Sequence, residues 1–289
     1  MRKTRRNRSA GAHAAVLAVS CALLAAPCWA HPGIDEQLAR LDEQLAAAPD
    51  DATLYLRRGE LHRIHRDYAK AEADYRAALG LDKELYIAQF CLGRLKIDSG
   101  ATEEGRAILD QYLSAHPDDP AALAYRGRAL MALGEPLAAA EDLSRAIRFA
   151  EPPRPEDFLE RARALASAGP EHVGKAIEGL DEGLRLLGQP VTLQVYAIDL
   201  ELARRNFDAA LRRLDSIASQ SVRQEPWLVR KGSILEAAGR LDEARSAYRQ
   251  TLASIENLPS ERRSNRAVER LEQEARQALE RLSPALTSQ

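Results

Sequence analysis

Four charged residues recur at a nearly constant interval along the chain, and together they could hold an acidic group. Arg94 follows Glu60 by 34 positions, Arg128 follows after another 34, and Arg163 after 35. A guanidinium donates paired hydrogen bonds to a carboxylate or phosphate, each contributing about 1.5–3 kcal/mol when partly shielded from water. The three arginines would then bind an acidic peptide or a C-terminal carboxylate. Alternatively, they are solvated residues paired with neighbouring acids, since 29% of the chain is charged.

Four apolar residues lie close to this row in the sequence, namely Leu56, Phe90, Ile97 and Met131. They predict a hydrophobic strip that would contact a ligand segment beside the arginines. They would serve equally well as core between structural repeats, which is the commoner fate of apolar residues at helical spacing.

Other chemistry is sparsely represented. His62 and His65 stand three positions apart, but no third ligand stands at helical spacing, so a packed histidine pair is favoured over a metal site. If His31 became the N-terminus, its amine and imidazole could bind copper, but a second histidine would be required and none can be assigned. Cys91 is expected to be a buried free thiol. The sequence holds no glycine-rich phosphate loop, nucleophile elbow or zinc-protease motif. It therefore predicts no catalytic site, no cofactor and no metal.

A regular period among small side chains predicts the elements that carry these groups. Gly59, Gly93 and Gly127 follow one another at steps of 34, and each begins a pattern with further core side chains 12, 16 and 19 positions later. Gly232 restarts the pattern 105 positions after Gly127, which leaves room for two less regular repeats. A small residue at the eighth place of one helix lets a second helix approach closely. The sequence thus predicts six helix pairs.

The chain resembles the tetratricopeptide repeat (TPR) family over roughly residues 50 to 258. The resemblance rests on Gly59-Glu-Leu, Gly134, Gly239-Arg-Leu-Asp-Glu-Ala244, and the prolines Pro49 and Pro117 between repeats. The chain departs from the family pattern at His62 and Lys96, at Lys83 and Glu151 in place of prolines, and at Ala162 in place of a glycine.

The resemblance implies an all-α fold, a right-handed superhelical solenoid of antiparallel helix pairs with about six TPR units plus capping helices. In this family, ligands bind on the concave surface lined by the first helix of each pair. One subset grips the C-terminal carboxylate of chaperones through lysine and asparagine. The equivalent positions here hold Leu56 and Glu60, so that particular activity is not implied.

The first thirty residues have the composition of a secretory signal. Five basic residues precede the apolar run Ala14–Ala26, and Cys28-Trp29-Ala30 offers a cleavage site after Ala30. The run of 13 is too short to span a bilayer. A retained anchor, or a lipoprotein site at Cys21 or Cys28, is the competing interpretation. Export through the twin-arginine route instead of ordinary secretion is left open.

The expected organisation has four parts: a secretory signal over 1–30, an N-terminal capping helix within 31–50, a TPR solenoid over 51–258 with two irregular central repeats, and a C-terminal cap and tail over 259–289. Single helices are expected over 34–47 and 260–282. Removal of the signal would leave 36 basic and 43 acidic residues, which argues against nucleic acid as a partner. Only Cys91 would remain, so no intramolecular disulfide is expected.

These features predict a non-enzymatic protein-interaction scaffold or adaptor in the cell envelope, periplasmic or secreted, without an integral membrane span after cleavage. Its partner would be a protein or peptide, acidic or carboxylate-bearing. Two alternatives are an assembly factor or holdase-type chaperone for exported proteins, and a metal-handling accessory protein.

Overall fold

The computed structural model describes residues 33–283, which form fifteen α-helices, one 3-10 helix and no strand. The elements are α1 (Ile34–Ala47), α2 (Ala52–Ile64), α3 (Tyr68–Leu81), α4 (Tyr86–Asp98), α5 (Thr102–Ala115), α6 (Pro120–Ala132), α7 (Pro136–Phe149), α8 (Pro155–Ala168), η1 (Pro170–His172), α9 (Val173–Leu187), α10 (Val191–Ala203), α11 (Phe207–Gln220), α12 (Glu225–Ala237), α13 (Leu241–Glu256), α14 (Ser260–Arg263) and α15 (Arg266–Leu282). The predicted signal lies outside this range. None of the helices within it is long and apolar enough to cross a membrane.

Twelve of these helices form six consecutive pairs, from α2 with α3 to α12 with α13. The first helices of the pairs begin at Ala52, Tyr86, Pro120, Pro155, Val191 and Glu225, so that successive starts differ by 34, 34, 35, 36 and 34 in sequence number. The predicted all-α solenoid of helix pairs is therefore confirmed.

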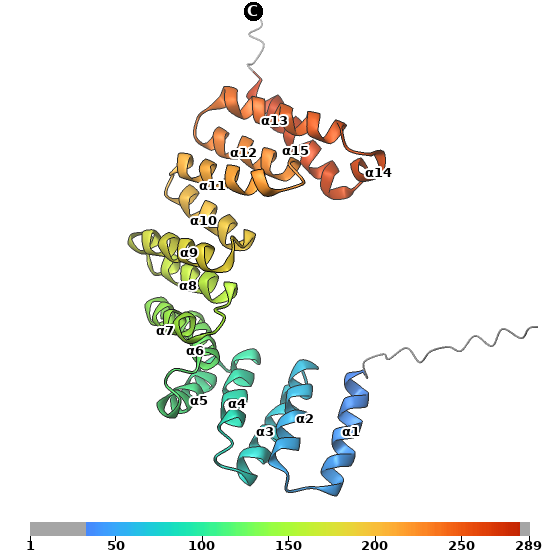
Figure 1. The fold of residues 1–289 in the computed structure, drawn as a ribbon, viewed down its shortest axis with the longest axis vertical. Helices are drawn as coiled ribbons and strands as arrows, with labels where there is room; N and C mark the ends of the chain where they lie inside the picture. The colour runs from blue at the N-terminus through green and yellow to red at the C-terminus, as the bar shows by residue number, and fades with distance from the viewer. Residues whose placement is uncertain (1–32, 284–289) are drawn as a thin grey trace, which may run out of the picture.

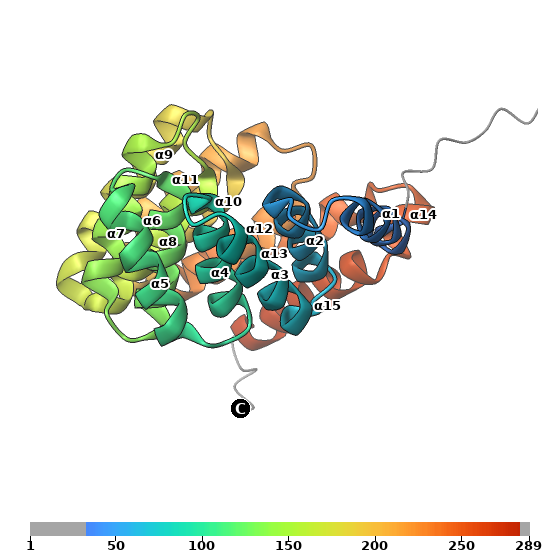
Figure 2. The same ribbon diagram turned by 90° about the horizontal axis from the view of Figure 1, so that it is seen from below.

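The pairs stack along an arc. Figure 1 shows α1 and α2 near one end and α13 and α15 at the other, with an open space between the ends. Viewed from below, α1 and α14 fall on the same side of the molecule (Figure 2), although Figure 1 separates them along the long axis. The stack thus winds as a superhelix and has an inner and an outer surface.

Aspartates start several of the helices. Asp51 accepts a hydrogen bond from the amide of Thr53 at 2.9 Å, and Asp119 accepts one from the amide of Ala122 at 2.8 Å. The first amides of a helix lack partners within it, so each carboxylate satisfies one exposed donor and complements the helix dipole. The Asp residues after Pro49 and Pro117 therefore fix where these helices begin.

The eighth-place glycines are points of contact between the two helices of a pair. A Cβ added to Gly59 would lie 2.7 Å from the Tyr75 ring, and one added to Gly232 would lie 2.6 Å from the Tyr248 ring. Both tyrosines are buried. These two pairs therefore close by placing a bulky side chain of the second helix directly on the glycine of the first.

The fourth and fifth pairs depart from this pattern in different ways. In the fourth pair, η1 lengthens the turn between α8 and α9, so the buried Ala176 follows Ala162 by 14 positions instead of 12. In the fifth, the fully buried Ile198 takes the eighth place, while Ala210 and Leu214 keep the regular offsets. The irregular repeats expected in the middle of the array are these two pairs.

The C-terminal segment is not the single helix expected over 260–282. It divides into α14 and α15, because the Asn265 side chain accepts a hydrogen bond from the Ala267 amide at 2.8 Å and starts a new helix. Helix α15 then packs along α13, with Val268, Ala275 and Ala278 buried.

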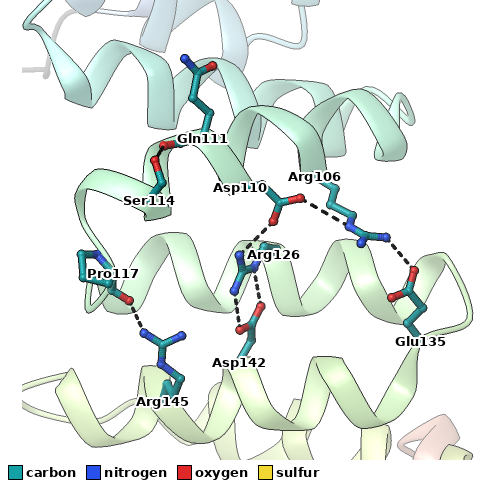
Figure 3. Close-up of polar contacts among 9 residues, drawn as sticks. All are labelled: Arg106, Asp110, Gln111, Ser114, Pro117, Arg126, Glu135, Asp142 and Arg145. Carbon is teal, nitrogen blue, oxygen red and sulfur yellow. Dashed lines mark hydrogen bonds and ion pairs between the residues drawn. The ribbon is translucent and has the colours of Figure 1, made fainter.

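Ion pairs tie neighbouring pairs to one another. Figure 3 shows Arg126 of α6 between two aspartates, at 2.6 Å from Asp142 of α7 and 2.9 Å from Asp110 of α5. Each aspartate stands sixteen positions from the arginine in the sequence. Asp142 is buried, and its two carboxylate oxygens both accept hydrogen bonds from Arg126. Such a paired arrangement satisfies a carboxylate that would otherwise be costly to bury.

Gly105→Ala should destabilise the protein by about 1–2 kcal/mol, although other second helices carry alanine at this place. The added Cβ would lie 2.6 Å from the Ile97 side chain and 2.8 Å from the Gly93 carbonyl oxygen, so backbone must shift. Gly80→Ala is the matched control, because nothing lies within 4 Å of its added Cβ. Urea unfolding should show a loss for the first variant and no loss for the second; equal stability would contradict the tight approach of α4 and α5.

Candidate protein-binding surface on the first helices

Predicted site residues line two hollows on the surface formed mainly by first helices. The larger, here named the α1 groove, has a volume of about 860 Å³ and spans α1, α2 and α4. It is lined by Gln37, Arg40, Leu41 and Gln44 of α1, by Leu56, Arg57, Glu60 and Leu61 of α2, and by Ile87, Phe90, Cys91 and Arg94 of α4. The groove combines apolar walls with three arginines and one glutamate.

The smaller hollow, here named the α6–α8 hollow, has a volume of about 200 Å³. It is lined by Arg128 and Met131 of α6, Leu143 of α7, and Glu160 and Arg163 of α8. Two of the three predicted arginines thus meet in one place, beside an apolar floor.

The predicted row of arginines is present, but two of its members already have acidic partners. Arg94 donates a short hydrogen bond to Glu60, the residue one repeat earlier. The Nε of Arg128 lies 2.9 Å from both carboxylate oxygens of Glu160. These two residues thus have the neighbouring acidic partners that the alternative interpretation expects.

Arg163 differs from the other two arginines. Its side chain is exposed and lies over the ring of Tyr196, at 5.7 Å from the ring centre, where a cation is attracted by the ring electrons. It makes no ion pair or hydrogen bond through its side chain with any residue from 33 to 283. Within residues 33–283 it is the arginine of the predicted row that has no acidic partner.

The four apolar candidates have separate positions. Leu56 and Phe90 line the α1 groove, although Phe90 is itself buried, and Met131 lines the α6–α8 hollow. Ile97 instead packs against α5, where its side chain and backbone lie against Gly105. The structure therefore brings three of the four to the hollows, and uses the fourth to close a helix pair.

A polar network beneath the α1 groove was not foreseen from the sequence. Glu60 accepts hydrogen bonds from the Tyr75 hydroxyl and from Arg94, and Arg63 lies 3.5 Å from its second oxygen. Arg63 also donates to Asp98 at 2.9 Å. The one-repeat spacing of Glu60 and Arg94 was the one sequence signal for this contact, because it places one residue beside the other on adjacent first helices.

The network shifts the acidities of its members. Burial opposes ionisation of Glu60, but the Tyr75 hydroxyl and Arg94 outweigh it and hold the pKa of Glu60 below its usual value. Burial, followed by the bond to Glu60, raises the pKa of Tyr75. Burial and the nearby Glu60 charge raise the pKa of the Cys91 thiol to about 12. Cys91 is thus a protonated, buried thiol, as expected, and a poor nucleophile.

The two histidines do not form the packed pair expected from their spacing. His62 is buried with Nε2 3.9 Å from Asp74, whereas His65 is exposed at the end of α2. Within residues 33–283 there is no group of three or more His, Cys, Asp or Glu side chains that could hold a metal ion. His31, the other candidate for copper, lies outside the described residues.

Glu60→Gln should lower the free energy of unfolding by about 1–3 kcal/mol at neutral pH, since Arg94 and Arg63 would lose their shared charge partner. Because the folded-state pKa of Glu60 is depressed, its contribution is complete above the ordinary glutamate pKa near 4.5 and is lost as pH falls through the lower folded value. Urea unfolding from pH 3 to 7 measures this; the exposed Glu43→Gln variant is the control. A difference from wild type that does not shrink towards pH 3 would contradict the assignment.

Family models of tetratricopeptide repeats match residues 52–85 and 92–155, and a model of a tetratricopeptide repeat-like domain matches residues 191–278. Each match begins at or within a first helix described above. A search among curated protein sequences finds no match.

Solved structures of TPR proteins share the fold at low sequence identity. The C-terminal part of a TPR repeat-containing protein from Cytophaga hutchinsonii is 13% identical, with a TM-score of 0.64 over 82% of this chain and 94% of its own. A TPR protein from Parabacteroides merdae is 15% identical, with a TM-score of 0.53 over 84% and 92%. Yeast Tom70 is 17% identical, with a TM-score of 0.52 over 77% of this chain and 47% of its own.

These structural likenesses concern the fold alone, but the sequence matches coincide with the repeats seen in the molecule. The three matches fall on five of the six helix pairs, and the regular repeat interval explains why the models recognise them. The chain belongs to the tetratricopeptide repeat family.

Proposed function

We propose that this protein is a non-catalytic scaffold of the cell envelope that binds a segment of a partner protein along its first helices. A superhelical array of repeats offers an extended inner surface, and such surfaces are what solenoid proteins use for binding. Function in a repeat scaffold depends on the side chains it displays there, so the proposal must rest on a particular hollow.

The α6–α8 hollow carries the proposal. It sets the exposed Arg163 beside Met131, so that one hollow offers both open guanidinium donors and apolar surface. A segment with a carboxylate next to an apolar side chain matches both features. The carboxylate would receive the hydrogen bonds that Arg163 does not make with residues 33–283.

Arg128 has a second role in this arrangement. Its pair with Glu160 has half-buried partners and forms one side of the hollow. Among the described residues Glu160 engages Arg128 through the Nε, so a ligand carboxylate that approached Arg128 would lie close to the negative charge of Glu160. Arg163 is therefore the principal contact, and Arg128 with Glu160 shapes the hollow and limits which acids fit.

Binding of one partner segment in the α6–α8 hollow can be tested by charge reversal and cross-linking in living cells. p-Benzoyl-phenylalanine placed at Met131 should cross-link one discrete partner, and Arg163→Glu should reduce that product at least tenfold. Arg148→Glu, an exposed arginine on the second helix α7, is the matched control and should leave the product unchanged. An unaltered product in Arg163→Glu would refute the role of the hollow. A diffuse set of many weakly cross-linked proteins would favour the holdase-type chaperone.

The envelope location rests on the composition of residues 1–30 and has its own test. N-terminal sequencing of protein recovered from the periplasm should give His31 as the first residue. Material that starts at Met1, or that carries lipid on Cys21 or Cys28, would contradict cleavage after Ala30. Copper measured in the same sample tests the metal-handling alternative, for which His31 at the N-terminus would be the ligand.

A further inference from the structure

Helix α1 occupies the place of a second helix whose first helix is missing from the described residues. Asp42 of α1 pairs with Arg58 of α2 at 2.7 Å, sixteen positions away. Asp110 of α5 pairs with Arg126 of α6 at 2.9 Å with the same separation. Helix α5 is the second helix of its pair, and α6 is the first helix of the next pair. Because α1 makes the same contact with α2 that α5 makes with α6, α1 has the position of a second helix.

The face of a second helix that contacts its own first helix is buried elsewhere in the array. In α3 this face consists of Ala71, Asp74, Tyr75 and Ala78, and in α7 of Ala139, Asp142, Leu143 and Ala146, all of them at most 5% exposed. Moving back by one repeat period from the α3 positions gives Gln37, Arg40, Leu41 and Gln44 in α1. These four residues are the ones that line the α1 groove.

With respect to residues 33–283, the groove is therefore a first-helix position that no helix fills. A helix placed there would lie along α1 and α2, and it would pack on α1 as α2 packs on α3. Only Leu41 of the four α1 residues is buried, through its contacts with Leu45 and Leu54, and it leaves an apolar point at the base of the groove. Arg40 and Gln44 remain exposed. The groove continues past this position to Ile87 and Phe90 of α4.

The charges in the groove indicate what kind of helix would fit. Three arginines line it against one glutamate, and Arg94 is already engaged by Glu60. Among residues 33–283, Arg40 bonds only Glu36 of its own helix, and both side chains are exposed, so that pair is weak. Arg57 is exposed and, apart from a through-space attraction to Asp51, has no ion pair or hydrogen bond with the rest of residues 33–283 through its side chain. Arg40 and Arg57 thus offer cationic donors on two sides of an apolar base.

We propose that the α1 groove receives an acidic amphipathic helix of a partner protein, which completes the half repeat begun by α1. The helix would set apolar side chains on Leu41 and Leu56 and carboxylates opposite Arg40 and Arg57. This inference rests on the proposed binding function, but it names a second site at the N-terminal end of the array and a helical ligand.

The chain's own first residues fit this position in length but not in charge. A first helix in register would cover residues 18–30, yet no acidic residue precedes Asp35, and Pro27 would fall inside that helix. Such a segment could not pair with Arg40 and Arg57. A partner with carboxylates is therefore the better match. The experiment must nevertheless be able to detect binding of the chain's own first residues in the groove.

The test uses two stapled fourteen-residue helices with the same leucine and alanine face, one carrying three glutamates beside that face and the other three lysines. Fluorescence anisotropy measures their binding to the full chain and to the chain from His31. The acidic helix should bind at least tenfold more tightly than the basic one, and the double variant Arg40→Glu, Arg57→Glu should reverse that preference. Arg148→Glu should leave it unchanged. No preference, or a preference that the double variant retains, would overturn the proposal.

If binding in solution is too weak to measure, each helix is joined to the chain in front of His31, so that binding becomes intramolecular. The acidic tether should raise the midpoint of thermal unfolding by several degrees more than the basic one, and equal midpoints would overturn the proposal. Binding of the acidic helix to the chain from His31 but not to the full chain would assign the groove to the chain's own first residues, and would also overturn it. The two proposals can fail separately. If cross-linking at Met131 does not depend on Arg163 but the acidic helix binds the α1 groove, the proposal for the α6–α8 hollow has failed. If cross-linking depends on Arg163 but the acidic helix is not preferred, the proposal for the α1 groove has failed.

Discussion

The whole molecule depends on how closely two helices of one pair can approach. At Gly59 and Gly232 a tyrosine of the second helix lies where a Cβ would be, so the pair closes over a single small residue. A pair closed in this way buries one stripe of each helix and leaves another stripe of each uncovered. Those stripes can be buried only against the next pair, and the array grows by that requirement. The inner surface exists because the first helices repeat this step at nearly equal intervals.

The same regularity decides which polar residues are free to bind a ligand. Residues one repeat apart on successive first helices come to lie side by side, so an arginine that follows an acid by one repeat will pair with it, as Arg94 does with Glu60. Arg126 follows the same rule at a separation of sixteen, since it pairs with Asp142 within its own helix pair and with Asp110 of the preceding pair. A charged side chain stays available where the repeat supplies no opposite charge one step away, as at Arg57, which Cys91 follows by one repeat. Arg163 also stays available among the described residues, because Asp199, its counterpart in the next repeat, pairs with Arg230 instead.

Much of the fold follows from the sequence, and much of the surface does not. The glycine interval predicts the first three pairs and the last, since a small residue at the eighth place is visible in the sequence. The fifth pair escapes this pattern because Ile198 fills the place, and the second helix of the fourth is displaced by η1. The partners of Arg94 and Arg128 depend on side-chain conformation across repeats, which spacing alone cannot fix. A search for opposite charges separated by a half repeat or by a whole repeat would have found contacts such as Arg126 with Asp110 and Arg94 with Glu60.

The two ends of the array are finished differently, and this difference gives the α1 groove its significance. At the C-terminal end, the seventeen-residue α15 lies along α13 and buries Val268, Ala275 and Ala278. At the N-terminal end, the fourteen-residue α1 buries only Leu41 and Leu45 and turns a polar stripe to the groove. In a linear array each unit is stabilised chiefly by its neighbours, so α1 and the first pair have the least support. A helix bound in the groove would supply the missing neighbour, and ligand binding there would be coupled directly to the stability of the first repeat.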